Sequence, residues 1–191
     1  FMSMLGLSYL REIVSKEKVT DSGQILKNLR NEVINTLKDN LEEGMDIALF
    51  SLNRKTKKLQ FSGANNPLYL IRKNGPDIDN PSVIKIETKN KSEFCLYEFT
   101  PDLMPISNYI KMDTFKTTEI SCQEGDYLYM FSDGYTDQLG GKNNRKFKFN
   151  RFRNLLAENV DKPAEIQKKI LTETFEKWKG DNTQLDDVVI V

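Results

Sequence analysis

The strongest constraint on the fold is an apolar run at residues 127–131, Tyr-Leu-Tyr-Met-Phe, which ends abruptly in Ser132-Asp133-Gly134. The run lacks the polar alternation of a half-exposed strand, and therefore predicts a strand that is covered on both faces. Asp133 is then expected at the rim of a core, where the following glycine lets the chain turn and the carboxylate can face a cation. Asp-Gly is also a common turn dipeptide, so an ordinary turn is the alternative.

A second acidic segment precedes another apolar run. Residues 188–191 are β-branched and predict a strand, with Asp186 and Asp187 at its entrance. If the two runs are neighbours in one sheet, Asp133 and Asp186 face each other, and like charges that close are tolerated mainly with a cation between them. Ligands that are all oxygen suit Mg²⁺ or Mn²⁺ rather than zinc. An N-cap or a solvated turn at Asp186-Asp187 is the alternative.

The length and charge of the chain exclude several classes of protein. A chain of 191 residues is expected to form one domain, 1–191, with a sizeable core. Its 28 basic residues balance its 28 acidic residues, so no net charge draws it to nucleic acid or to an anionic membrane. No apolar run reaches the length of a membrane span. We therefore expect no nucleic-acid partner and no membrane segment in this chain.

The absence of histidine limits the chemistry further. Without it, Ser-His-Asp and Cys-His catalysis, imidazole bases and histidine-containing zinc sites are all excluded. The two cysteines, Cys95 and Cys122, lack the spacing of metal ligands, which favours a reduced, cytoplasmic protein. Carboxylates must therefore carry any acid-base or metal chemistry.

Three stretches predict helices. Residues 1–14 carry apolar side chains at helical spacing, and residues 21–41 begin with Asp21 and Gln24, which resemble a capping box. A third helix is expected from Pro163 to about Gly180. The second stretch has an i,i+4 row of Ile25, Leu29, Val33, Leu37 and Leu41. The third is expected to bury Ile166, Ile170, Leu171, Phe175 and Trp178. A packed layer explains the apolar faces of the first two helices, and docking of a partner helix is the alternative.

Several strands separate these helices. Apolar and β-branched stretches predict them at residues 45–52, 59–64, 68–72, 83–86, 94–99 and 112–120. The polar connection at 53–58 predicts a hairpin between the first two. Antiparallel strands in succession, with helices gathered at the ends, indicate an α+β protein with an antiparallel β-sandwich flanked by helices.

The segment at residues 140–153 is glycine-led and then basic, with interleaved phenylalanines. Such a segment could bind single-stranded nucleic acid through phosphate pairing and base stacking. The simpler interpretation is that Phe147, Phe149 and Phe152 anchor a mobile flap and a short helix.

Six stretches of this chain form an ordered set of motifs: FMSMLGLSYLREIV, SGANNPLYLIR, PDLMPIS, EGDYLYMFSDGYTDQLGG, KFKFNRF and GDNTQLDDVVIV. In this order they resemble the SpoIIE-like branch of the PPM metal-dependent protein serine/threonine phosphatases. The resemblance implies a binuclear Mg²⁺ or Mn²⁺ centre at the edge of a β-sandwich, which activates water to hydrolyse phosphoserine or phosphothreonine. It implies that Asp133 is the Asp-Gly ligand and Asp186 the first acidic ligand of the Asp-Asp motif, with Asp187 as a further candidate metal ligand.

The resemblance also carries expectations about partners. It implies a bacterial signalling protein that has sensor or repeat domains upstream. Its substrate is expected to be a phosphorylated protein, and an anti-sigma-factor antagonist is a candidate.

One departure from the family pattern bears on activity. The Gly-Asp pair and the Asp-x-x-Gly-His-Gly-type motif that supply further metal ligands are not found, and residues 1–14 begin a helix with neither an N-cap nor an initiator Met. We therefore expect a domain that lacks its N-terminal portion and is inactive by itself. A non-catalytic phosphatase fold, kept as an interaction or scaffold domain, is the alternative function.

Overall fold

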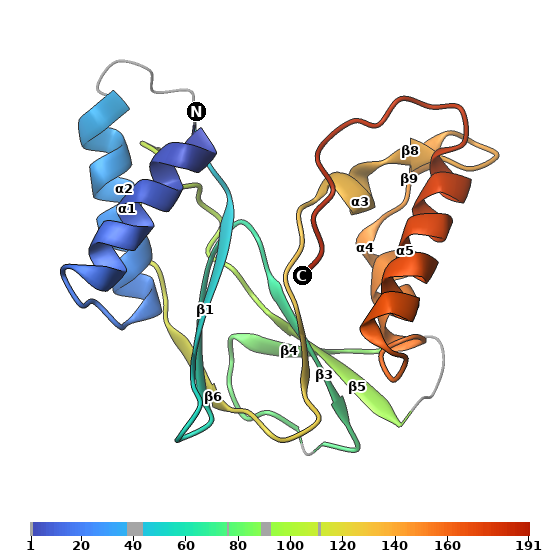
Figure 1. Cartoon of the computed structure of the whole chain (residues 1–191), viewed down its shortest axis with the longest axis horizontal. Coiled ribbons are helices and arrows are strands. Elements are labelled where there is room, and N and C mark those ends of the chain that lie inside the picture. Colours follow the sequence, from blue (N-terminus) through green and yellow to red (C-terminus); the bar gives the residue numbers. More distant parts are fainter. Residues whose placement is uncertain (1, 38–43, 76, 89–92, 111) are drawn as a thin grey trace. The chain divides into compact units, whose positions relative to one another are not determined.

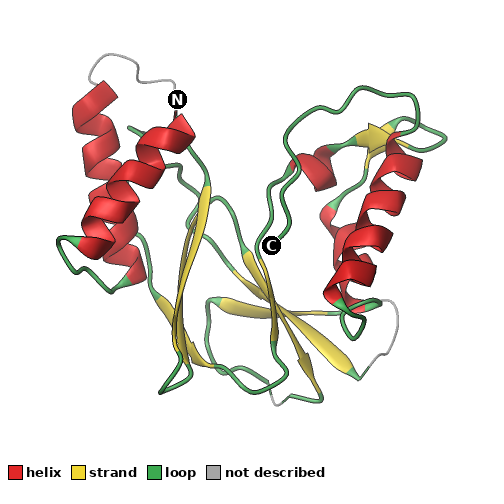
Figure 2. Cartoon of the chain, viewed as in Figure 1, coloured by secondary structure: helices red, strands yellow, loops and turns green. Residues whose placement is uncertain are grey.

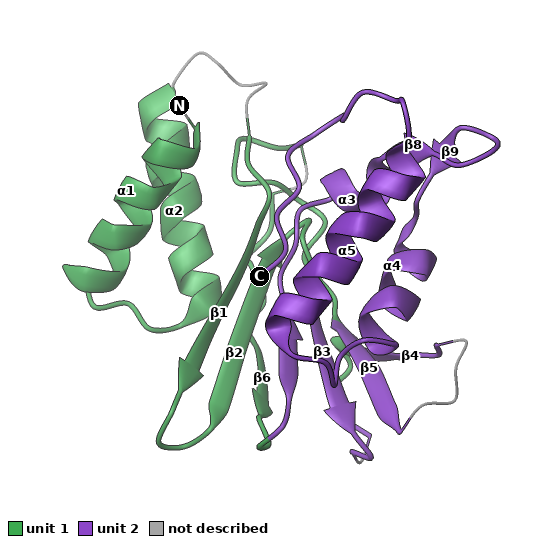
Figure 3. Ribbon diagram, turned by 45° about the vertical axis from the view of Figure 1, so that its right-hand side comes forward, with its two compact units in different colours: residues 1–68, 79–83, 99–124 green, residues 69–78, 84–98, 125–191 purple. Residues whose placement is uncertain are grey.

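The structure is a computed structural model, and it describes residues 2–37, 44–75, 77–88, 93–110 and 112–191 (Figure 1). The chain forms two compact units and passes between them several times (Figure 3). Unit 1 comprises Phe1–Leu68, Asp79–Val83 and Phe99–Glu124, and unit 2 comprises Tyr69–Ile78, Ile84–Glu98 and Gly125–Val191. Each unit contains both helices and strands (Figure 2).

Unit 1 begins with two packed helices, α1 (Met2–Ser15) and α2 (Ser22–Leu37). Asp21 caps α2 as predicted, since its Oδ1 accepts a hydrogen bond from the backbone N–H of Gln24 at 2.8 Å. The predicted apolar row of α2 is largely confirmed, and the expected extension to Leu41 lies outside the described residues. The buried core of this unit consists of Ile13, Ile25, Leu26, Leu29, Val33, Ala64, Met104, Ile106 and Phe115.

The sheet of unit 1 has the strand order β1-β2-β6 and is antiparallel. Its strands are β1 (Ile47–Asn53), β2 (Lys58–Ala64) and β6 (Thr118–Ser121). The predicted hairpin is confirmed. The predicted strand at 112–120 is too long, because the N–H of Lys116 donates to the Asp102 side chain and its carbonyl accepts from the Ser62 hydroxyl, instead of pairing with a neighbouring strand.

The second sheet has the order β4-β5-β3-β7, and lies in unit 2 except at the ends of three strands. Its strands are β3 (Leu68–Lys73), β4 (Val83–Ile86), β5 (Phe94–Phe99) and β7 (Tyr127–Tyr129). The prediction for residues 127–131 is wrong in two respects. The strand ends at Tyr129, because only 127–129 pair with β3. Tyr127 and Leu128 are half-buried, so the strand is not covered on both faces.

The remaining elements of unit 2 follow β7. They are α3 (Gly134–Asp137), β8 (Leu139–Gly140), β9 (Arg145–Lys146), α4 (Phe149–Ala157) and α5 (Ala164–Lys179). Pro163 precedes α5, and Gly180 ends it with a φ of +55°, a conformation that favours glycine. Ile166 was predicted to face inward but is 44% exposed, because the buried side of α5 follows Leu171, Phe175 and Trp178.

Aromatic side chains dominate the core of unit 2. Phe152 is fully buried, with ring centroids 4.9 Å from Phe131 and 5.0 Å from Tyr135. Phe147 packs edge-on against Tyr135 at 5.1 Å, so the predicted anchoring of residues 140–153 by Phe147 and Phe152 is confirmed. Phe149 is 38% exposed and anchors this segment less.

Both units combine helices with antiparallel strand pairs, which confirms the predicted α+β class. In the described part of the chain, every helix is too short or too polar to cross a membrane.

Two phenylalanines of α4 offer a matched test of this core. We expect Phe152→Ala to lower the free energy of unfolding by about 3–5 kcal/mol, since it leaves a cavity among packed rings. Phe149→Ala should cost about 1–2 kcal/mol, because that side chain is already partly in water. Urea denaturation of both variants measures the difference, and equal losses would contradict the burial described here.

Candidate functional site

The two apolar runs that were predicted to be neighbours lie side by side in unit 2 (Figure 1). Met130 and Val191 exchange two backbone hydrogen bonds with N···O distances of 3.0 and 2.9 Å. Phe131 and Ile190 form an antiparallel bridge between these ends. This pairing is a single bridge, so residues 188–191 do not form the predicted regular strand. The adjacency of the two segments is nevertheless confirmed.

Ser132 extends this pairing toward the acidic residues. Its backbone N–H donates to the carbonyl of Val189 at 3.0 Å, and its Oγ accepts from the N–H of Val189 at the same distance. The same hydroxyl donates to the carbonyl of Asp187 at 2.7 Å. One serine therefore bonds to both sides of Val188 and fixes the backbone immediately after Asp186.

Gly134 lies against the same backbone. A Cβ atom added to it would lie 2.4 Å from the carbonyl oxygen of Asp187 and 3.2 Å from that of Asp186. Real Cβ atoms do not approach a backbone oxygen as closely as the first of these distances. Glycine is therefore required here for close approach, and the Asp133-Gly134 turn is in direct contact with the Asp186-Asp187 segment.

Asp133 is exposed and is the N-cap of α3. Its carbonyl accepts hydrogen bonds from Asp137 N–H and Thr136 Oγ1, both at 2.9 Å. An N-cap aspartate usually accepts a hydrogen bond from the first turn through its side chain, but the side chain of Asp133 makes no such cap. The backbone of Asp133 is thus held firmly by the first turn of α3.

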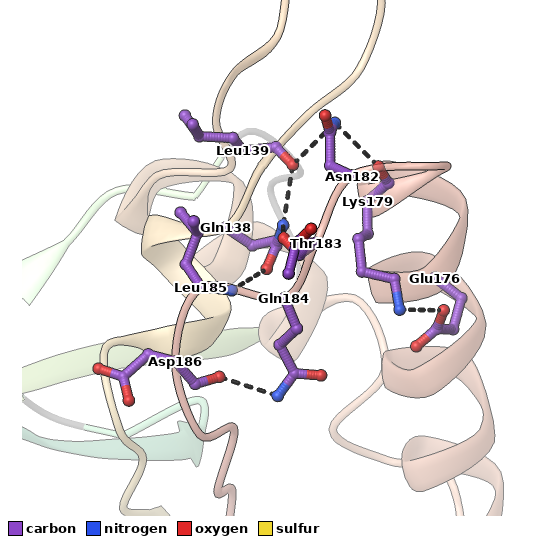
Figure 4. A network of polar contacts seen from close by, with 9 residues as sticks. All are labelled: Gln138, Leu139, Glu176, Lys179, Asn182, Thr183, Gln184, Leu185 and Asp186. Carbon is purple, nitrogen blue, oxygen red and sulfur yellow. Dashed lines mark hydrogen bonds and ion pairs between the residues drawn. The ribbon is translucent and has the colours of Figure 1, made fainter.

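Asp186 and Asp187 are exposed as well. Asp186 Oδ1 accepts from the N–H of Asp187 at 2.7 Å, and the carbonyl of Asp186 accepts from Gln184 Nε2 at 2.8 Å. In Figure 4 the Asp186 carboxylate points away from the polar network that holds its backbone. A carboxylate in this position can meet a ligand from solvent.

Two tyrosines near Asp133 in the sequence are buried, and their hydroxyls are hydrogen-bonded. Tyr135, in α3, donates from its hydroxyl to the carbonyl of Leu171 at 2.8 Å, and burial raises its pKa. Tyr129 donates to Gln167 Oε1 at 2.7 Å, and burial raises the pKa of Tyr129 to about 12. Both hydroxyls stay protonated near neutral pH, so they serve as hydrogen-bond donors and not as general bases.

The donor set of this site suits one class of ligand. Asp133, Asp186 and Asp187 offer only oxygen atoms on two adjoining segments, which matches the ligand preference of Mg²⁺ and Mn²⁺. Within the ranges that the structure describes, no group of three or more His, Cys, Asp or Glu side chains is placed to hold a metal ion. The chemistry of these three side chains therefore fits a divalent cation.

The sequence did not single out two residues that organise this site, Ser132 and Gln138. Both act through backbone groups about 50 positions away, which a local pattern cannot reveal. Gln138 stands between Asp137 and Leu139 in a mixed polar stretch, so no local signal in the sequence marks it.

Comparison with known families gives one clear result. The family described as Stage II sporulation protein E (SpoIIE) matches residues 1–191, the whole chain. A comparison with curated protein sequences found no match.

Comparison with solved structures shows the fold. The SiaA-PP2C domain of Pseudomonas aeruginosa is 22% identical with a TM-score of 0.80, covering 99% of this chain and 67% of that one. RsbX, solved in complex with magnesium, is 10% identical with a TM-score of 0.55, covering 97% and 70%. The phosphatase domain of the cell fate determinant SpoIIE from Bacillus subtilis is 15% identical with a TM-score of 0.51, covering 97% and 69%. The chain thus has the fold of PP2C-type phosphatases, and it belongs to the SpoIIE family.

Proposed function

We propose that this chain belongs to the phosphatase domain of a bacterial signalling protein, and that the full-length protein hydrolyses phosphoserine or phosphothreonine on a partner protein with the help of Mg²⁺ or Mn²⁺. The observation that carries the proposal is the contact between the Asp133-Gly134 turn and the backbone of Asp186-Asp187. In a member of the SpoIIE family, this contact supports the assignment of the two acidic segments to one ligand site.

The proposed roles follow from the chemistry of carboxylates. Asp133 and Asp186 would hold a divalent cation through their oxygens, with Asp187 as a further ligand, and the remaining ligands would come from other residues of the centre. Bound divalent ions lower the pKa of water and neutralise phosphoryl charge, so hydrolysis needs no histidine. The magnesium in the RsbX structure supports this choice of ion.

The proposed substrate follows from the family to which the chain belongs. The PP2C domain of SiaA and the phosphatase domain of SpoIIE support a phosphatase. The family resemblance of the sequence motifs implies that its substrate is a phosphorylated protein, with an anti-sigma-factor antagonist as one candidate. The test is release of phosphate from a phosphoserine-containing protein by the full-length protein, with and without Mn²⁺. A folded protein that releases no phosphate under any Mn²⁺ concentration would refute the proposal.

A second function, that of an interaction domain, is favoured by one surface. The outer side of α1 exposes Met4, Leu7 and Val14, with exposed fractions of 79%, 70% and 47%. An apolar stripe of this kind is a usual feature of helices that contact a partner. The catalytic test above separates the two functions, because a scaffold would bind its partner without releasing phosphate.

Charge replacement tests the proposed ligands in the full-length protein. We expect Asp133→Asn and Asp186→Asn each to lower Mn²⁺-dependent phosphate release by more than about 100-fold, since even loss of a ligand's supporting partner costs roughly 10–100-fold. Asp137→Asn is the control. It removes only an exposed ion pair with Lys146, 2.6 Å long, worth at most about 1 kcal/mol of stability. Activity that survives both ligand changes and disappears in the control would show that the assignment is wrong.

Gly134 tests the contact between the two segments. We expect Gly134→Ala to destabilise the fold by about 1–3 kcal/mol and to weaken Mn²⁺ activation, because the new methyl group pushes the Asp187 carbonyl away. Gly6→Ala, inside α1, is the matched control. There the added Cβ meets only the flexible end of the Met45 side chain, at 2.9 Å, and alanine favours the helix. Urea denaturation and Mn²⁺ titration measure both variants, and a neutral Gly134→Ala would contradict the close packing.

A further inference from the structure

Gln138 is a fully buried polar residue at the end of α3. Its side-chain Nε2 donates to the carbonyls of Leu139 and Thr183, each at 3.0 Å, and its Oε1 accepts from the N–H of Leu185 at 3.2 Å (Figure 4). Every polar atom of the amide is therefore bonded to backbone. Two of the three partners belong to the segment that leads directly into Asp186.

The backbone of Gln138 is itself held in place. Its carbonyl accepts from Trp178 Nε1 and from the N–H of Phe147, both at 3.0 Å. The N–H of Gly141 donates to the carbonyl of Trp178 at 2.9 Å, which ties the following residues to the same helix end. The position of Gln138 is thus fixed, and the hydrogen bonds of its amide restrain residues 183–185.

The segment that it holds has little apolar packing of its own. Residues 180–187 are all exposed, and the largest apolar side chain among them, Leu185, is 56% exposed. Hydrogen bonds must therefore set its path, because almost no buried apolar surface is available for that purpose. The amide of Gln138 pairs with the C=O of Thr183 and the N–H of Leu185 as a neighbouring strand would.

Only glutamine has the chemistry that this position uses. The amide supplies donors and an acceptor at one end, so it can satisfy a carbonyl and an N–H on the same segment. Methionine has similar length but neither group, and asparagine is one methylene shorter. An ionised glutamate would turn an acceptor oxygen toward the carbonyls of Leu139 and Thr183.

We propose that Gln138 is a positioning residue that holds Asp186 against Asp133. The short helix α3 lies between its N-cap Asp133 and its C-cap Gln138. Both of its ends are tied to the acidic segment, one through Ser132 and Gly134 and the other through Gln138. Gln138 is buried and does not contact the ligand itself. Its consequence for metal binding rests on the proposed function, whereas its hold on residues 183–185 does not.

The experiment compares Gln138→Met with Gln167→Met in the full-length protein. Gln167 is a matched control, since its amide also makes three hydrogen bonds in unit 2, to Val160, Lys162 and Tyr129, away from the acidic segments. Hydrogen exchange of residues 183–187 should be at least about tenfold faster in Gln138→Met and unchanged in Gln167→Met. The Mn²⁺ dissociation constant, measured by electron paramagnetic resonance of free Mn²⁺, should rise about 10–100-fold in the first variant only.

Gln138→Glu is a second variant, in which the protection of residues 183–187 can be restored by pH. It keeps the inference testable if Gln138→Met does not fold. A protonated carboxyl group carries one donor and one acceptor like the amide, so protection of residues 183–187 relative to the wild type should recover as the pH falls through the pKa of this buried group. A purely structural loss of stability would show no such recovery.

The outcomes are distinct. Unchanged exchange in Gln138→Met, or faster exchange with an unchanged Mn²⁺ dissociation constant, would overturn the inference, as would a wild type that binds no Mn²⁺. A wild type that binds Mn²⁺ but releases no phosphate refutes the proposed function alone, and the shift in Mn²⁺ affinity then still supports the role of Gln138.

Discussion

The candidate site depends on one backbone interaction, the antiparallel pairing of residues 130–132 with residues 189–191. Both segments are too short to be stable alone, and their pairing leads the chain on each side directly to aspartates. Because register in a β-pairing determines which residues are neighbours, the bridge between Phe131 and Ile190 sets Gly134 opposite Asp187. A shift of one residue would point the side chains on this segment the other way and separate the two acidic segments.

Much of the fold could be predicted from the sequence because its signals are local. The capping of α2 by Asp21 and the hairpin of β1 and β2 each follow from a few adjacent residues. The predictions failed where contacts with residues distant in the sequence determine the end of a strand or the burial of a side chain. The predicted strand at 127–131 stops at Tyr129, because the next residues leave β3 and pair with residues far along the chain. Ile166 has the right spacing for the core, but tertiary packing leaves it outside.

The residues of the candidate site also fall into those that the sequence reveals and those that it does not. The aspartates were identifiable because acidic residues at the ends of apolar runs are conspicuous in a sequence. Ser132 and Gln138 were not, since their partners are peptide groups of residues 183–189, and any sequence presents such groups. A supporting residue whose partner is backbone leaves no mark in the partner's sequence. Only the folded structure can therefore reveal it.

The chemistry of these supports fits what an acidic ligand site needs. A lysine or arginine beside Asp186 would hold the segment, but it would also neutralise the charge that attracts a divalent cation. The groups that hold the segment here are a hydroxyl, an amide and backbone N–H and C=O groups, all of them neutral. They restrain the position of the carboxylates and leave their charge intact. Hydrogen bonds that hold the segment in place reduce the conformational entropy that ligand binding must remove, so neutral anchoring favours affinity through both charge and order.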